Sequence, residues 1–200
     1  MNVSTLSDIH GDIRRSLEED VAKRKLAPDL ILLLGDLTYK PALDSSNAPE
    51  RTRKRSRDMT MLLSVLSRIE STHGIAFLFG NDDYRELATE VVKDDNRARM
   101  SDEFNAMSLD FEYHRISGYW FIGIEGSPVT PWQTPYEFAE DELYRKGSEL
   151  FTEVKRLDTR AEIVLASHWG GWSVAPLSRL VSSDLQALRL SKPQHHREPL

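Results

Sequence analysis

Four short apolar runs, separated by longer amphipathic segments, constrain the fold of this chain more than any other feature. The clearest is DLILLLG (29–35), a near-continuous apolar run between Pro28 and Gly35. Such a run is typical of a strand that is covered on both faces. The other three are NVSTLS (2–7), GIAFLFG (74–80) and AEIVLAS (161–167). Strands of this kind alternating with helices predict an α/β fold.

The segments between these runs predict helices, a hairpin and a cap. Apolar residues recur at helical spacing around Leu62, and the stretches 138–158 and 176–190 also indicate helices. Ser117-Gly118 separates two strand-like segments and predicts a tight hairpin turn. The polar, weakly periodic region 84–110 is interpreted as a cap or lid. We expect one domain over residues 1–200, with 191–200 as a frayed tail.

Composition narrows the classes of function. The formal net charge is −6, so the field of the whole protein does not favour nucleic acid. The chain has no cysteine, which rules out thiolate chemistry and disulfides. No apolar run approaches the ~20 residues of a membrane span, and the first residues do not have the pattern of a signal peptide. We therefore expect a cytoplasmic protein that does not bind membranes, and the oligomeric state stays open.

Polar side chains follow each of the four apolar runs. Asp8 and His10 come after the first, Asp36 after the second, Asn81 after the third and His168 after the fourth. In an open α/β sheet, ligands collect outside the carboxyl ends of the strands. Each residue alone could equally be a helix cap or a turn residue. Together they predict one crevice lined by carboxylate, amide and imidazole groups.

This donor set suits divalent metal ions. Oxygen and imidazole ligands without thiolate favour Mn, with Fe, Zn and Mg as alternatives. A carboxylate can bridge two cations, and two cations about 3.5–4 Å apart can bind phosphate oxygens and activate a water molecule. Asp36 lies in sequence between the other ligands and is the natural bridge.

The order of these motifs resembles that of the calcineurin-like metallophosphoesterase superfamily. The matching motifs are D-x-H-G (8–11), G-D (35–36), G-N-x-D (80–83) and the strand that ends at His168. A further stretch, GIEGSPVTPWQTPYEFAEDELYR (123–145), is similar to a segment of bacterial and archaeal phosphoesterases related to the Icc cyclic-nucleotide phosphodiesterases. The resemblance spans about residues 2 to 190.

The resemblance implies a four-layer α/β/β/α sandwich with a two-metal centre. Asp8 and His10 would hold one metal ion, Asn81 and His168 the other, and Asp36 both. The implied activity is hydrolysis of a phosphomonoester or phosphodiester, with a cyclic nucleotide among the candidates. Metal-activated water would attack phosphorus in line, and Asn81 would bind the substrate and stabilise the developing charge.

Two departures from the family pattern affect this interpretation. The family usually has His where this chain has Asp82, and a carboxylate beside two cations is a poor proton donor because their field lowers its pKa. Asp82 is therefore the weaker catalytic candidate, with a turn or hydrogen-bonding role as the alternative. The closing G-H-x-H motif and the strand that carries it are also missing, so we expect a sandwich that lacks its final strand and binds metal more weakly.

The adjacent His195 and His196 do not replace that motif in our interpretation. A five-residue strand returning to the site would cover about 16 Å, whereas the two residues from Pro193 to His195 span only about 7 Å. We expect both histidines to lie in the polar tail, although a rearranged tail or a neighbouring subunit could bring them to a site.

Two further stretches have competing interpretations. RTRKRSR (51–57) is a solvated helix face or a phosphate-attracting rim, and no nucleic-acid-binding motif accompanies it. Trp169 either packs against the cap or stacks on an aromatic part of the substrate. The rival of the enzyme hypothesis is a catalytically impaired scaffold that binds a protein partner. The five retained ligand residues argue against it.

Overall fold

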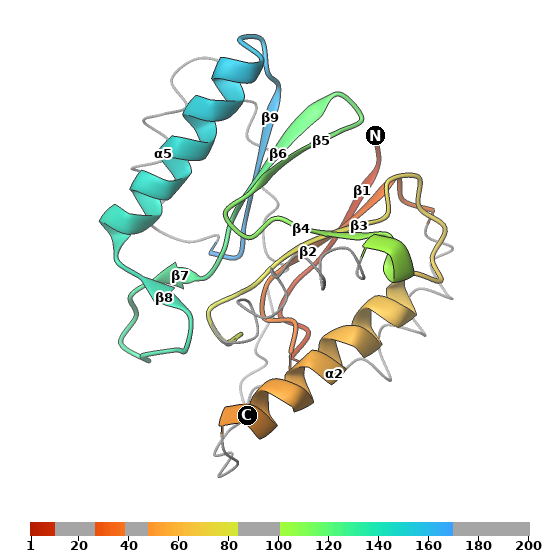
Figure 1. Ribbon diagram of the computed structural model, residues 1–200, viewed down its shortest axis with the longest axis vertical. Helices are drawn as coiled ribbons and strands as arrows, with labels where there is room; N and C mark the ends of the chain where they lie inside the picture. Colours follow the sequence, from red (N-terminus) through yellow and green to blue (C-terminus); the bar gives the residue numbers. More distant parts are fainter. Residues whose placement is uncertain (11–26, 39–47, 84–100, 170–200) are drawn as a thin grey trace, which may run out of the picture.

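The computed structural model describes residues 1–10, 27–38, 48–83 and 101–169 (Figure 1). Its first sheet is fully parallel and has the strand order β1-β2-β3-β4. The strands are β1 (Val3–Leu6), β2 (Leu30–Leu34), β3 (Ile75–Leu78) and β4 (Ala106–Ser108). Because neighbouring strands point the same way, the segments after β1, β2 and β3 leave the sheet at the same edge. This edge carries the candidate site.

The second sheet has the order β5-β6-β9. Its strands are β5 (Tyr113–Ile116), β6 (Tyr119–Ile124) and β9 (Ile163–Ser167). β5 and β6 are antiparallel and form the expected hairpin, whose turn residues Ser117 and Gly118 both have positive φ, 52° and 90°. A two-residue turn of this kind matches the right-handed twist of the strands. β9 runs parallel to β6, so its carboxyl end lies beside that of β6.

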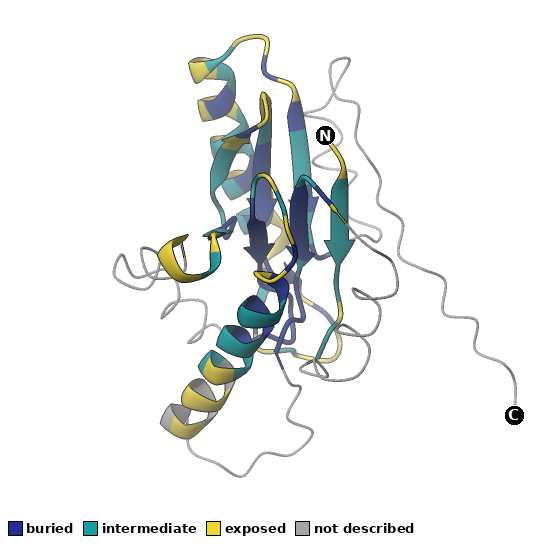
Figure 2. Ribbon diagram, turned by 90° about the vertical axis from the view of Figure 1, so that its right-hand side faces the viewer, coloured by how far each residue is buried: buried dark blue, intermediate teal, exposed yellow. Residues whose placement is uncertain are grey.

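The two sheets pack face to face. Alternate residues of a strand point to opposite faces, and Leu30 and Leu32 of β2 belong to one cluster with Phe121 of β6 and Ala166 of β9. These side chains are almost completely buried. Figure 2 shows the same arrangement, with the buried strands in the middle of the molecule and exposed residues on the outer faces of the helices.

Two long helices accompany the sheets. α2 (Ala48–Leu66) contributes Met59 and Leu63 to a cluster with Ile31 and Phe77 of the first sheet, whose side chains alternate with those facing the second sheet. α5 (Glu140–Leu157) lies along β6 and β9 (Figure 1). Its first turn is acidic and its last turn basic, which complements the helix dipole. The fold is therefore a mixed α/β structure, as expected.

Two short strands, β7 (Ser127–Pro128) and β8 (Glu137–Phe138), pair in parallel and close the loop between β6 and α5. No sequence pattern predicted them. The expected cap also differs in part, because residues 106–108 form β4 of the first sheet. The remainder of that segment over 84–100, the expected helix 176–190 and the tail 191–200 lie outside the described residues.

Candidate metal centre

The ends of four strands meet at one place, as the sequence predicted. Asp36 follows β2 and Asn81 follows β3 in the first sheet, while His168 follows β9 in the second. His168 Nδ1 donates a hydrogen bond to the carbonyl oxygen of Leu34 at 2.7 Å, and its Nε2 lies 2.9 Å from Asn81 Oδ1. The carboxyl ends of both sheets therefore contribute to the same site.

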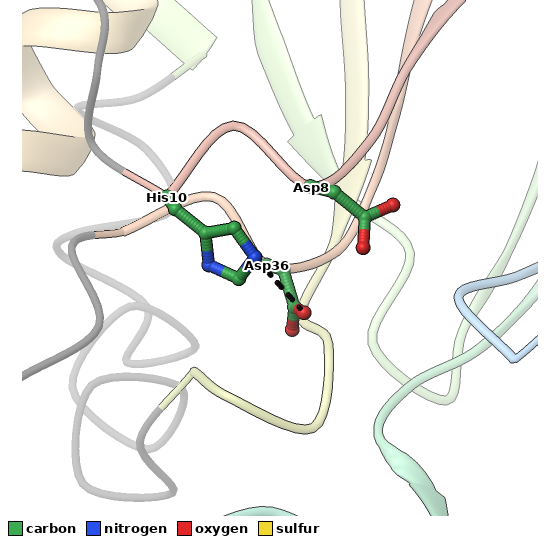
Figure 3. A group of neighbouring side chains, drawn as sticks. All are labelled: Asp8, His10 and Asp36. Carbon is green, nitrogen blue, oxygen red and sulfur yellow. Dashed lines mark ion pairs between the residues drawn. The ribbon is translucent and has the colours of Figure 1, made fainter. Parts of the chain in front are cut away.

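Three side chains form one half of this site (Figure 3). One ligand atom from each of Asp8, His10 and Asp36 lies within 4.8 Å of the other two. His10 Nε2 is 3.8 Å from Asp36 Oδ2, which is too long for a hydrogen bond. Two ligands that are each about 2.1 Å from a shared cation can be up to about 4.2 Å apart, so the His10–Asp36 separation fits a metal ion between them.

The other half of the site faces the second oxygen of Asp36. His168 Nε2 lies 3.4 Å from Asp36 Oδ1, and the Asn81 amide oxygen lies beside the same imidazole nitrogen. His168 and Asp36 are both buried. The two carboxylate oxygens of Asp36 thus face two different sets of donors. A carboxylate with donors beside both of its oxygens can bridge two cations.

The backbone around the ligands is held in an uncommon conformation. Asp8, His10 and Asp36 all have positive φ, at 57°, 49° and 53°. Non-glycine residues rarely adopt this region, although Asp, Asn and His do so more readily than others. The Asp8 and His10 N–H groups donate to the carbonyl oxygens of Gly35 and Asp36, at 3.1 and 2.9 Å. These bonds fix the loop after β1 against the loop after β2.

Two glycines allow the strand ends to come this close. A Cβ atom on Gly35 would lie 2.6 Å from Gly80 Cα and 2.7 Å from the His168 ring. A Cβ atom on Gly80 would lie 2.3 Å from Asp36 Oδ1. All three distances are far below ordinary contact, so the close approach of the backbone and the candidate ligands requires glycine in G-D and in G-N-x-D.

Asp83 connects the loop after β2 to the loop after β3 through hydrogen bonds. Its buried carboxylate accepts hydrogen bonds from the backbone N–H groups of Leu37, Thr38 and Gly80 and from the Thr38 hydroxyl, at 2.9 to 3.2 Å. Burial raises the pKa of Asp83, and the negative charge of Asp36 adds to this effect, while the hydrogen bonds oppose it. Asp83 therefore fixes Asp36 and Asn81 relative to each other.

The electrostatics of Asp36 and His168 are linked. Burial has the largest single effect on Asp36 and would raise its pKa, but the hydrogen bond and charge of His168 and the N–H of Asp82 outweigh it, so the pKa is lowered. Burial likewise would lower the pKa of His168, but Asp36, together with the Leu34 carbonyl and Asp8, outweighs it and raises the pKa. Because Nδ1 donates to Leu34, the Nε2 atom is the one that a metal ion could bind in place of a proton.

The other predicted site residues are not all placed by the structure. Asp82 is buried, and its backbone N–H donates to Asp36 Oδ1 at 3.0 Å. Trp169 directly follows His168 and is partly exposed. His195 and His196 lie outside the described residues. The structure thus brings together Asp8, His10, Asp36, Asn81 and His168, but it does not test the catalytic role of Asp82 or the substrate contact of Trp169.

Residues that were not predicted as site residues support Asn81. Its side-chain Nδ2 donates to Thr134 Oγ1 at 3.0 Å. The Tyr136 N–H donates to the backbone carbonyl oxygen of Asn81 at 3.1 Å. Thr134 and Tyr136 belong to the loop 127–137. The Thr-Pro and Glu residues of this loop belong to segment 123–145, whose sequence is similar to a family segment. The sequence pattern did not indicate that this loop contacts Asn81.

Comparison with solved structures shows the class of fold. The crystal structure of TT1561 of Thermus thermophilus matches with a TM-score of 0.61 and 18% identity, over 89% of this chain and 76% of that chain. A second crystal structure matches with a TM-score of 0.59 and 12% identity, over 82% of this chain and 67% of that chain. At these identities the likeness shows a shared α/β fold.

Among curated proteins, the chain is similar to the uncharacterized protein MJ1162 of Methanocaldococcus jannaschii. The two are 26% identical over 170 residues, which cover 84% of this chain and 60% of the relative. The chain therefore spans about three fifths of the length of this relative. No family model matches the chain. Within the described ranges, no helix has the length and apolar character needed to cross a membrane.

Proposed function

We propose that this protein is a divalent-metal-dependent phosphoesterase. The observation that carries the proposal is the position of Asp36 between two donor sets. Its Oδ2 lies 3.8 Å from His10 Nε2, and its Oδ1 lies 3.4 Å from His168 Nε2. A buried carboxylate with an imidazole on each side provides ligands for two cations, with the carboxylate bridging them.

The proposed centre holds two divalent metal ions. Asp8 and His10 would hold the first, Asn81 and His168 would hold the second, and Asp36 would hold both. The mixed oxygen and nitrogen donors favour Mn²⁺, with Fe, Zn and Mg as the alternatives. Each ion has three protein ligands in this arrangement, which leaves positions for water and substrate.

In the proposed hydrolysis, the metal ions and the side chains have different roles. When bound, the ions supply an activated water molecule and neutralise the phosphate oxygens. The Asn81 amide has a second N–H bond beyond the one directed at Thr134, and it donates to a phosphate oxygen as charge develops there. Asp82 holds Asp36 through its backbone N–H and remains the weaker candidate for a proton-transfer role. Trp169, beside His168, contacts the organic part of a small phosphate ester.

The arrangement of elements supports the finer fold assignment. Alternate side chains of β2 and β3 join either the cluster between the sheets or the cluster that contains α2. α5 lies along the second sheet (Figure 1). We propose on this basis that the chain has the four-layer α/β/β/α architecture of metallophosphoesterases.

The experiment combines metal content with hydrolysis. Metal bound per chain is measured after loading with Mn²⁺, and turnover is measured with bis(p-nitrophenyl) phosphate and p-nitrophenyl phosphate. Asp36→Asn is the test variant. Glu149→Gln is the matched control, because Glu149 is an exposed carboxylate on α5 that pairs with Arg145. Two metal ions and turnover that is lost in Asp36→Asn but kept in Glu149→Gln are the expected results.

The opposite result has a definite meaning. If the wild-type protein binds no metal and hydrolyses neither substrate with added Mn²⁺, the phosphoesterase proposal is wrong. The non-catalytic scaffold, which binds a protein partner, would then be the better interpretation.

A further inference from the structure

In the loop 127–137, the Glu137 carboxylate accepts hydrogen bonds from two threonines. Glu137 accepts hydrogen bonds from the N–H groups of Thr130 and Thr134, at 3.1 and 2.8 Å, and from both threonine hydroxyls. Partial burial raises the pKa of Glu137, but these four hydrogen bonds outweigh it and lower the pKa. Glu137 is therefore an ionised carboxylate, which can only accept hydrogen bonds.

The charge of Glu137 fixes the direction of the next hydrogen bond. A threonine hydroxyl has one proton to donate, and that of Thr134 goes to Glu137 Oε1. Toward any other partner, Thr134 Oγ1 can only accept. Its other partner is the Asn81 side chain, 3.0 Å away. The group of Asn81 that faces Thr134 must therefore be the NH₂ group.

This direction decides which atom of Asn81 faces the metal centre. The two ends of a side-chain amide have nearly the same shape and are told apart by their hydrogen bonds. With NH₂ directed at Thr134, the amide oxygen is directed at His168 Nε2, 2.9 Å away. Only the oxygen is a useful metal ligand, so the opposite orientation would present a donor to the cation.

We propose that Thr134, held by Glu137, is a positioning residue that orients the Asn81 amide oxygen toward the second metal ion. The inference rests on the proposed metal centre and adds to it a chain of three residues, Glu137, Thr134 and Asn81. Thr134 acts through Asn81 and touches neither metal nor substrate. Partners that orient metal ligands commonly change metal affinity by about 10- to 100-fold when they are removed.

The same loop provides a matched control. Thr130 donates its N–H and its hydroxyl to Glu137, as Thr134 does, and the structure gives it no hydrogen bond to Asn81 within the described residues. Thr130→Val therefore removes an equivalent hydroxyl from Glu137 and leaves the Asn81 contact in place. Thr134→Val removes the contact, and Thr134→Ser keeps it.

The test is a titration of the metal-depleted protein with Mn²⁺, in which free Mn²⁺ is followed by electron paramagnetic resonance. In Thr134→Val, we expect one of the two binding steps to weaken by about 10- to 100-fold, while the step at Asp8 and His10 changes little. Thr134→Ser should restore wild-type binding, and Thr130→Val should bind as the wild type does. Melting temperatures of all four metal-depleted proteins show whether the variants fold equally well.

The outcomes separate this inference from the proposed function. Two wild-type binding steps that are unchanged in Thr134→Val would overturn the positioning role and leave the metal centre intact. Equal weakening in Thr134→Val and Thr130→Val would also overturn it, because loop order rather than amide orientation would then be responsible. A wild-type protein that binds no Mn²⁺ would refute the proposed function itself.

Discussion

The sharpest prediction concerns Gly80, where an added Cβ atom would meet Asp36, the proposed bridging ligand. In Gly80→Ala the new methyl group would lie 2.3 Å from Asp36 Oδ1 and 2.4 Å from the Asp36 backbone nitrogen. Ordinary contact for a Cβ atom begins at 3.4 Å, so the overlap with the oxygen is 3.4 minus 2.3, or about 1.1 Å. Rotation of the Asp36 side chain cannot relieve the second contact, because that contact is to backbone. The loops after β2 and β3 must therefore separate.

The size of the effect follows from this displacement. A shift of about 1 Å in a reacting geometry can lower a rate by about 100-fold, and overpacking of this kind destabilises by about 1–3 kcal/mol. In Gly80→Ala we therefore expect turnover of bis(p-nitrophenyl) phosphate to fall at least about 100-fold. We expect binding of Mn²⁺ to weaken for both ions, because the proposed centre shares Asp36 between them.

Gly118→Ala is the matched control for this prediction. Gly118 has a φ of 90° in the β5–β6 turn and no neighbouring atom within 4 Å of an added Cβ. The substitution places alanine in the left-handed region and should destabilise by about 1–2 kcal/mol, without touching the site. Both variants should melt earlier, and only Gly80→Ala should lose metal. If Gly80→Ala binds two Mn²⁺ ions with wild-type affinity, the bridging role of Asp36 is wrong.

Three other predictions address the surroundings of the site. Asp83→Ala leaves three backbone N–H groups without this acceptor. It should lower the free energy of unfolding, measured by urea denaturation, by about 3 kcal/mol or more. A change below about 1 kcal/mol would contradict the role of Asp83 in connecting the two loops. Asp110 lies just after β4 and accepts a hydrogen bond from the Phe79 N–H. Burial, and then the charge of Glu125, raise the pKa of Asp110 well above its usual value. Its contribution to stability is therefore complete below the unfolded-state pKa and is lost as pH rises through the folded-state pKa. Stability measured from pH 4 upward should therefore fall more steeply with pH in the wild type than in Asp110→Asn, and parallel curves would disprove this linkage. Mn²⁺ should raise the melting temperature of the wild type because ligands that bind only the folded state stabilise it, and an equal rise in Asp36→Asn would show that the ion binds elsewhere.

Much of the fold could be predicted because its strands are marked by local patterns. Continuous apolar residues in 29–35 and 74–80 predicted β2 and β3 to within about two residues at each end, since a strand covered on both faces has few polar positions. β4 was missed for the opposite reason. It has only three residues, Ala106–Ser108, and its assignment depends on pairing with β3 rather than on any pattern of its own.

The topology of the sheet made it possible to predict that the candidate ligands lie close together. Their orientation could not be predicted from the sequence. Parallel strands bring their carboxyl ends to one edge, so Asp36 and Asn81 were expected to meet, although they are 45 residues apart in sequence. The positive φ angles of Asp8, His10 and Asp36 have no comparable signature. These angles result from hydrogen bonds between loops, such as His10 N–H to the Asp36 carbonyl oxygen, which form only after the sheet has assembled.

The contacts that hold the candidate ligands show the same limit more clearly. Asp83 connects the loops after β2 and β3, and Thr134 connects Asn81 to a loop 53 residues further along the chain. Both contacts rely on ordinary turn residues, whose types alone predict only local structure. Because the chain itself makes both contacts, they orient the candidate ligands without a bound metal ion. A preorganised site of this kind loses less conformational entropy on binding, which would favour binding at the proposed centre.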